Sequence, residues 1–248
     1  MPKMTDMDIQ TVYQPGTNAF AFSAVKVDSL QASEYTLVDL AVDISGSVSA
    51  FEHQIEKCVK EIIKACAKSP RSDNLLMRVT RFNNRADEVH GYKPLANCNL
   101  DNYNGVFSAY GGTALFEATH NAVRAQMAYA KELKKNDYAA NGIVFIITDG
   151  DDNANSMSPD SVKLALEESK KSEALESLVS ILVGVNVQSQ VLSSYLNQFQ
   201  QAAGITQFVS IDDASDKKLA RLAEFVSKSI VSQSQALGTG GASQTLTF

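Results

Sequence analysis

The sequence contains few cysteines, and their spacing argues against disulfide bonds. Only three of the 248 residues are cysteines, namely Cys58, Cys66 and Cys98. Cys58 and Cys66 lie on one predicted helix, and a rise of about 1.5 Å per residue separates them by about 12 Å, beyond the reach of a disulfide. We therefore expect free thiols that pack as small hydrophobic side chains in a reducing compartment, which predicts a cytoplasmic protein.

The sequence also lacks an excess of positive charge and any long hydrophobic run. It has 22 Lys and Arg against 28 Asp and Glu, a net charge of −6. A nucleic-acid partner is not expected, because nucleic-acid binders need a basic surface. No membrane span is expected either, since no apolar stretch approaches the roughly 20 residues that a spanning helix requires. Residues 1–14 lack the apolar core of a signal peptide.

The motifs of common enzyme classes are missing as well. No serine lies in a G-x-S-x-G sequence, and the Gly-rich segment 238–241 lacks the Lys and the helix that follow it in a phosphate-binding loop. His53, His90 and His120 have no acidic partner that the sequence reveals, so each is expected to be a surface or packing histidine. These absences predict that the protein is not an enzyme.

What is present is an alternation of apolar strands and amphipathic helices. Strands are predicted over residues 35–42, 75–82, 86–92, 142–148, 178–185 and 206–210. Helices are predicted over 49–68, 114–133, 190–203 and 215–231, and a further helix is predicted to start at Ser158. Helices between strands predict an α/β fold with a doubly wound, mostly parallel, Rossmann-like central sheet and helices on both faces. The short turn at 83–85 predicts a hairpin, and hence one antiparallel edge strand.

The α/β pattern predicts one domain over residues 35–231, with a segment outside it at each end. Residues 1–34 form an N-terminal segment, in which apolar and polar residues alternate over 19–30 and can add an edge strand or a hairpin. Residues 232–248 are rich in Gly, Ser, Thr and Gln, and this composition predicts a flexible tail.

Three oxygen-bearing side chains follow the first predicted strand of the domain. Asp43, Ser45 and Ser47 lie at its carboxyl end, the edge where open α/β sheets bind ligands. Carboxylate and hydroxyl oxygens suit Mg²⁺, Ca²⁺ or Mn²⁺, whereas zinc prefers Cys or His. The alternative is a helix cap, because Ser49 and Glu52 have the spacing of a capping box.

Two further residues favour the metal site. Thr113 precedes a predicted helix and can present its hydroxyl from the loop or act as a helix cap. Asp149 ends the most hydrophobic strand, where an unpaired carboxylate would be costly to bury. If the two strands are neighbours, five side chains meet and form an oxygen site with room for a water or for a partner's acid. These are Asp43, Ser45, Ser47, Thr113 and Asp149.

The same segments resemble the von Willebrand factor type A family. DISGS at 43–47 is similar to the family's D-x-S-x-S motif, Thr113 in GGTALFEA to its threonine loop, and Asp149 in ITDGDDN to its terminal aspartate. The resemblance covers about residues 35–231. It implies a metal-ion-dependent adhesion site that holds Mg²⁺, with Mn²⁺ or Ca²⁺ as alternatives, on the five residues named above.

The resemblance also implies a function. Members of this family generally bind a partner protein whose Glu or Asp completes the coordination of the metal, so we expect an intracellular accessory or adaptor protein. Analogy with stand-alone members suggests a link to an AAA+ ATPase system. Two alternatives remain: a structural subunit of a larger assembly, or a Mg²⁺-dependent hydrolase, although Ser45 stands where aspartyl-phosphate phosphatases place a second acid.

The segment that follows the central strand has the ligand spacing of a calcium loop of the EF-hand type. This spacing is met by Asp149, Asp151, Asn153, Asn155 and Asp160. However, Ala154 replaces the glycine at the sixth position, the last ligand is Asp rather than Glu, and a strand rather than a helix precedes the loop. We therefore do not expect such a loop and interpret the acidic residues as a solvated rim.

Overall fold

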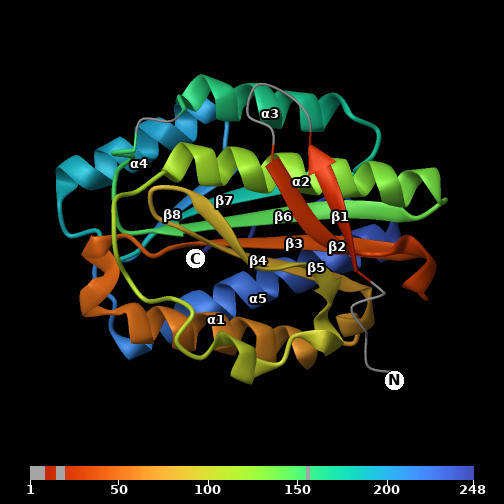
Figure 1. The fold of residues 1–248 in the computed structure, drawn as a ribbon, viewed down its shortest axis with the longest axis horizontal. Helices are drawn as coiled ribbons and strands as arrows, with labels where there is room; N and C mark the ends of the chain where they lie inside the picture. The colour runs from red at the N-terminus through yellow and green to blue at the C-terminus, as the bar shows by residue number, and fades with distance from the viewer. Residues whose placement is uncertain (1–8, 15–19, 155–156) are drawn as a thin grey trace.

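The computed structural model describes residues 9–14, 20–154 and 157–248 (Figure 1). Parts of the N-terminal segment and Asn155 of the acidic loop therefore lie outside the described residues. The strands are β1 (Ile9–Gln14), β2 (Phe20–Val25), β3 (Glu34–Asp43), β4 (Leu75–Phe82), β5 (Ala86–Pro94), β6 (Ala139–Thr148), β7 (Leu178–Gly184) and β8 (Gln207–Ser210). The helices are α1 (Glu52–Ala67), α2 (Leu115–Lys135), α3 (Pro159–Lys171), α4 (Gln190–Ala203) and α5 (Asp216–Thr239).

The described strands form one eight-stranded sheet in the order β1-β2-β5-β4-β3-β6-β7-β8. The strands from β4 through β3, β6 and β7 to β8 are parallel, and β5 runs antiparallel to β4. The predicted α/β fold with a mostly parallel sheet is therefore confirmed. Because parallel neighbours end at the same edge, the carboxyl ends of β3 and β6 lie together, on the left in Figure 1.

Helices cover both faces of the sheet. In Figure 1, α1 and α5 lie below the sheet edge, and α2, α3 and α4 lie above it. Successive residues of β3 pack on opposite faces of the sheet, which explains why most of its sequence is apolar. Val38, Leu40 and Val42 pack into the core between the sheet and helices α1 and α5. Ala41 packs into the core on the other face, between the sheet and helices α2 and α3. A strand buried on both faces cannot alternate apolar and polar residues.

The N-terminal hairpin of β1 and β2 extends the sheet beyond β5. A buried ionic cluster holds it in place. The Glu88 carboxylate accepts hydrogen bonds from the Ser23 backbone N–H (3.0 Å) and hydroxyl (2.9 Å), and from Arg78 Nε (2.9 Å). Arg78 Nη1 also donates to Asp39 Oδ2 (2.8 Å). Only glycine fits at Gly91, because a Cβ there would lie 1.7 Å from the Ser23 carbonyl oxygen.

The C-terminal segment is more ordered than its composition predicts. Helix α5 ends at Thr239 rather than at residue 231, so the predicted end of this helix is wrong. Beyond the helix, the Phe248 ring packs edge-on against Phe225, with centroids 5.4 Å apart, and the Arg221 guanidinium lies 4.8 Å from the Phe248 centroid. Burial of an aromatic ring outweighs the weak local propensity of this segment.

None of the helices in the described part of the chain has both the length and the apolar character of a membrane span.

Candidate metal centre

Asp43 is the innermost residue of the candidate centre. It is the last residue of β3, and its side chain is 2% exposed. Asp43 Oδ1 accepts a hydrogen bond from the Ser45 backbone N–H (2.7 Å), and Asp43 Oδ2 accepts one from Thr148 Oγ1 (2.5 Å). Two donors on different segments therefore fix the orientation of this carboxylate.

A chain of hydrogen bonds connects Asp43 to Asp149. Ser45 Oγ and Ser47 Oγ lie 3.0 Å apart, and Ser47 Oγ donates to Asp149 Oδ1 at 2.7 Å. Ser45 is buried, whereas Ser47 is exposed, so the centre opens to solvent on the Ser47 side. Four of the five predicted residues are thus connected at the carboxyl ends of β3 and β6.

Thr113, the fifth predicted residue, is brought to the same edge by its loop. The Gly46 N–H donates to the Gly111 carbonyl oxygen (3.0 Å), which joins the 43–47 loop to the loop before α2. The Thr113 hydroxyl oxygen lies 3.8 Å from the position that a Cβ on Gly150 would take, and Gly150 follows Asp149 directly. The loop that carries Thr113 therefore packs against the same edge of the sheet as the other four predicted residues.

The helix-cap interpretation of these residues is wrong. Ser49 lies within a short 3-10 segment rather than at the start of α1, and that helix has no side-chain cap. Glu52 instead accepts a hydrogen bond from the Ala109 backbone N–H (2.7 Å). Thr113 does not cap α2 either, because the residue at that position is Ala114.

The two carboxylates are electrostatically unfavourable neighbours. Burial is the main cause that raises the pKa of Asp43 to about 7, the negative charge of Asp149 adds to the rise, and the hydrogen bonds from Thr148 and Ser45 oppose it. Burial also raises the pKa of Asp149, against the hydrogen bond from Ser47. A bound divalent cation would instead lower the pKa values of Asp43 and Asp149, since it stabilises the charged form of both carboxylates.

The centre differs from sites built on clusters of acids, histidines or cysteines. Within the described ranges, no group of three or more such side chains is arranged to hold a metal. Two carboxylates and three hydroxyl groups are instead the donors of a hard cation. The acidic segment after β6 forms hydrogen bonds with the start of α2 and the loop before it. Asp152 Oδ2 accepts a hydrogen bond from the Phe116 N–H (3.0 Å), and Asn153 Oδ1 accepts one from the Thr113 N–H (2.7 Å).

Sequence reasoning missed several residues that shape this centre. The sequence predicts Thr148 only as part of a strand, although its hydroxyl orients Asp43. It predicts Asn83 and Asn84 only as a hairpin turn, yet the Asn83 carbonyl oxygen accepts a hydrogen bond from the Ala114 N–H (2.5 Å) and Asn84 Oδ1 accepts one from the Gly112 N–H (2.6 Å). Their position after β4, at the edge that holds the centre, is the signal that would have revealed them.

Comparisons with known proteins identify the kind of fold. No protein-family model matches the sequence, and no curated protein matches it. The structure is similar to proximal thread matrix protein 1 from the mussel byssus, with 20% identity, a TM-score of 0.54 and coverage of 80% of this chain. This chain spans only 46% of that protein. Another structure of the same protein has a zinc-occupied metal-ion-dependent adhesion site, with 19% identity and a TM-score of 0.55.

Two bacterial proteins are also similar. The PilB minor pilin from Streptococcus sanguinis has 15% identity and a TM-score of 0.59, covering 92% of this chain and 68% of the pilin. The conserved hypothetical protein BatB from Bacteroides thetaiotaomicron has 14% identity and a TM-score of 0.53, covering 78% of this chain and 98% of BatB. At such low identity these likenesses define the fold alone. The chain therefore shares with these proteins a Rossmann-like α/β fold with a mostly parallel central sheet.

Proposed function

We propose that this chain is a metal-dependent protein-binding module. The observation that supports the proposal is that hydrogen bonds connect Asp43, Ser45, Ser47 and Asp149 at one edge of the sheet, against which the loop of Thr113 packs. The similarity to a protein whose adhesion site holds zinc supports a divalent metal in general. The ligands would be Asp43, Ser45, Ser47, Thr113 and Asp149.

Mg²⁺ is the cation that this set of donors fits best, with Mn²⁺ and Ca²⁺ as alternatives. All donors are hard oxygens, and the three cysteines are buried as free thiols. Burial raises the pKa values of Asp43 and Asp149, and a bound cation would supply the positive charge that stabilises both carboxylates in their ionised form. When bound, the cation would supply an open coordination position for an acidic group.

The partner would be a protein that places a Glu or Asp side chain on this cation. The edge is accessible, because Ser47 is exposed and Tyr110, on the neighbouring loop, is 57% exposed. We propose a non-enzymatic, cytoplasmic adaptor or accessory role for this binding. An AAA+ ATPase system as the partner rests on family analogy alone.

The metal site is tested directly by calorimetric titration of Mg²⁺ and Mn²⁺ into the purified chain. The unmodified protein should bind one ion per chain, and Asp149→Ala should lose that binding because it removes one of two carboxylates. Ser49→Ala is the matched control, since Ser49 lies in the adjoining 3-10 segment outside the centre. Unchanged affinity in both Asp43→Ala and Asp149→Ala would falsify the site.

The binding role is tested by capture of partners from native lysate with Mg²⁺ and with EDTA. A specific partner should be retained only with Mg²⁺ and should be lost with Asp43→Ala. Retention in EDTA would instead indicate a structural subunit, and turnover of a phosphate ester that depends on Mg²⁺ and Asp43 would indicate a hydrolase.

A further inference from the structure

Two asparagine side chains hold the backbone at Thr113 and at the residue before it. Asn84 Oδ1 accepts a hydrogen bond from the Gly112 N–H (2.6 Å), and Asn153 Oδ1 accepts one from the Thr113 N–H (2.7 Å). The Asn153 N–H in turn donates to the Thr113 carbonyl oxygen (3.0 Å). A single residue therefore holds both backbone polar groups of Thr113.

The two asparagines belong to different loops at the carboxyl edge of the sheet. Asn84 lies in the turn between β4 and β5, and Asn153 lies in the loop after β6 that also carries Asp149. The hydrogen bonds of Asn153 therefore connect the segments of two proposed ligands, Thr113 and Asp149. A change that breaks these bonds would release the two segments from one another.

Gly112 lies where the two amide oxygens converge. A Cβ at this position would lie 2.6 Å from Asn153 Oδ1 and 2.8 Å from Asn84 Oδ1, which is closer than a carbon atom can approach an oxygen without displacing it. The backbone of Gly112 is not in the left-handed region, so its conformation does not require glycine. The close approach of the two amides does, and any side chain here would push at least one of them away.

A ligand held in this way suits a cation with strict geometry. Mg²⁺ demands near-ideal octahedral coordination with short bonds, whereas Ca²⁺ accepts longer bonds and a variable number of oxygens. Residues that hold a ligand from behind commonly tune the affinity of a metal site. We propose that Asn84 and Asn153 are positioning residues that fix Thr113 for coordination and give the centre its preference for Mg²⁺ over Ca²⁺. This inference rests on the proposed metal function and adds the source of its selectivity.

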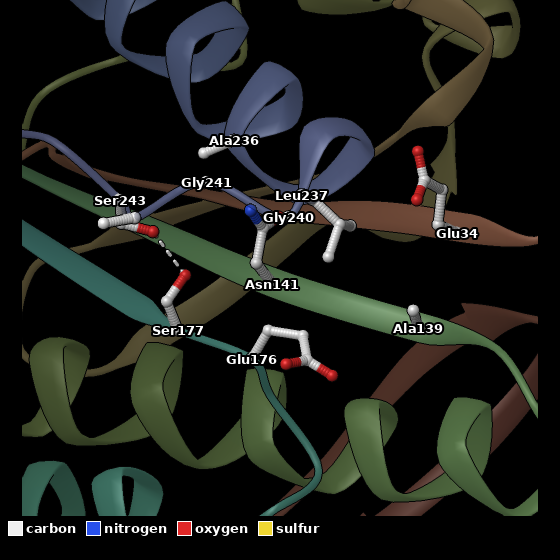
Figure 2. A pocket seen from close by; sticks show the side chains of 11 residues that line it. Glu34, Ala139, Asn141, Glu176, Ser177, Ala236, Leu237, Gly240, Gly241 and Ser243 are labelled. Atoms are coloured by element: carbon white, nitrogen blue, oxygen red, sulfur yellow. Dashed lines mark hydrogen bonds between the residues drawn. The ribbon is translucent and has the colours of Figure 1, made fainter.

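The opposite end of the same strands offers a place for control substitutions. A cavity of about 290 Å³ lies there between β6 and the C-terminal end of α5, and Figure 2 shows the residues that line it. Neither asparagine lines this cavity, and none of the five proposed ligands does. Glu176 lines it and is exposed, so Glu176→Gln removes one negative charge far from the loops of the centre.

The experiment is a calorimetric titration of Mg²⁺ and, separately, of Ca²⁺ into the full chain after metals have been removed. The unmodified chain should bind Mg²⁺ more tightly than Ca²⁺. Asn153→Ala should weaken Mg²⁺ binding about tenfold or more, but Ca²⁺ binding by about threefold or less, since Ca²⁺ tolerates a displaced ligand. A general loss of structure would weaken the binding of both ions alike, so the ratio of the two Kd values reports positioning.

Three further variants test the same contacts. Asn84→Ala and Gly112→Ala should shift the ratio of Kd values in the same direction as Asn153→Ala, because each breaks the arrangement from another side. Asn153→Asp keeps an oxygen acceptor and should retain Mg²⁺ binding. Asn84 and Asn153 are both exposed, so the chain should still fold, and thermal unfolding in EDTA checks this.

Two controls should bind both ions as the unmodified chain does. One is Glu176→Gln, and the other is Asn136→Ala, which removes an exposed amide that donates to the Glu132 carbonyl oxygen at the end of α2. Unchanged Mg²⁺ affinity in Asn153→Ala and Asn84→Ala, an equal loss for both ions, or tighter binding of Ca²⁺ by the unmodified chain would overturn the proposal. If Asp149→Ala still abolishes Mg²⁺ binding in those cases, the proposed metal function stands without it. Absence of binding to the unmodified chain would refute both.

Discussion

Replacement of Asp43 by asparagine should stabilise the metal-free protein and remove its response to Mg²⁺. Burial raises the pKa of Asp43 to about 7, whereas an unfolded aspartate titrates near 4. Folding therefore opposes ionisation, and stability without metal should fall as the pH rises from about 4 to about 7. Three pH units at about 1.4 kcal/mol each give a penalty of up to about 4 kcal/mol at pH 8, which Asp43→Asn avoids.

Mg²⁺ should increase the stability of the unmodified chain. At a concentration one hundred times the Kd, ligand binding adds about 2.7 kcal/mol to the free energy of unfolding. For a domain of this size that corresponds to a rise in Tm of roughly 5 to 10 °C. Asp43→Asn should show little rise, because a neutral amide replaces one of the two carboxylates.

Thermal unfolding at pH 5 and pH 8, each in EDTA and in Mg²⁺, measures both effects. Asp101→Asn is the control, since Asp101 is an exposed acid that is not one of the five predicted ligands, and it should behave like the unmodified protein. The reasoning is refuted if Asp43→Asn is no more stable than the unmodified chain in EDTA at pH 8, or if Mg²⁺ raises the Tm of both proteins equally.

Three further predictions concern the scaffold. Burial lowers the pKa of His90 to about 3, so His90 stays neutral when folded and protonates near pH 6.5 when unfolded. Stability should therefore fall as the pH drops below about 6.5, and His90→Gln should remove about 1 to 2 kcal/mol of that loss at pH 5 in urea unfolding. Gly91→Ala should displace β2, because the added Cβ meets the Ser23 carbonyl oxygen, and hydrogen exchange of residues 20–25 should accelerate. Unchanged exchange there would contradict this. Arg78→Met should reduce the free energy of unfolding by about 3 to 5 kcal/mol, because it leaves buried acids unpaired, and a loss below 1 kcal/mol would refute that estimate.

The sequence by itself determined the elements of the domain and the candidate ligands. Buried strands are continuous apolar runs, so the polar residues that follow such a run mark the end of the strand. This holds whatever the order of the strands in the sheet. For this reason the limits of β4 and α4, and the positions of Asp43 and Asp149 at strand ends, follow from local pattern.

Only the tertiary structure decided which residues meet. The parallel register of β3 and β6, in which Val42 pairs with Ile147, brings the Thr148 hydroxyl onto Asp43, and no local pattern encodes that register. The same holds for Arg78 and for Phe248, whose neighbours lie far away in the sequence. Polar residues in a strand and a weakly patterned C-terminus find their partners through packing, since burial and paired charges outweigh the local propensities that a sequence displays.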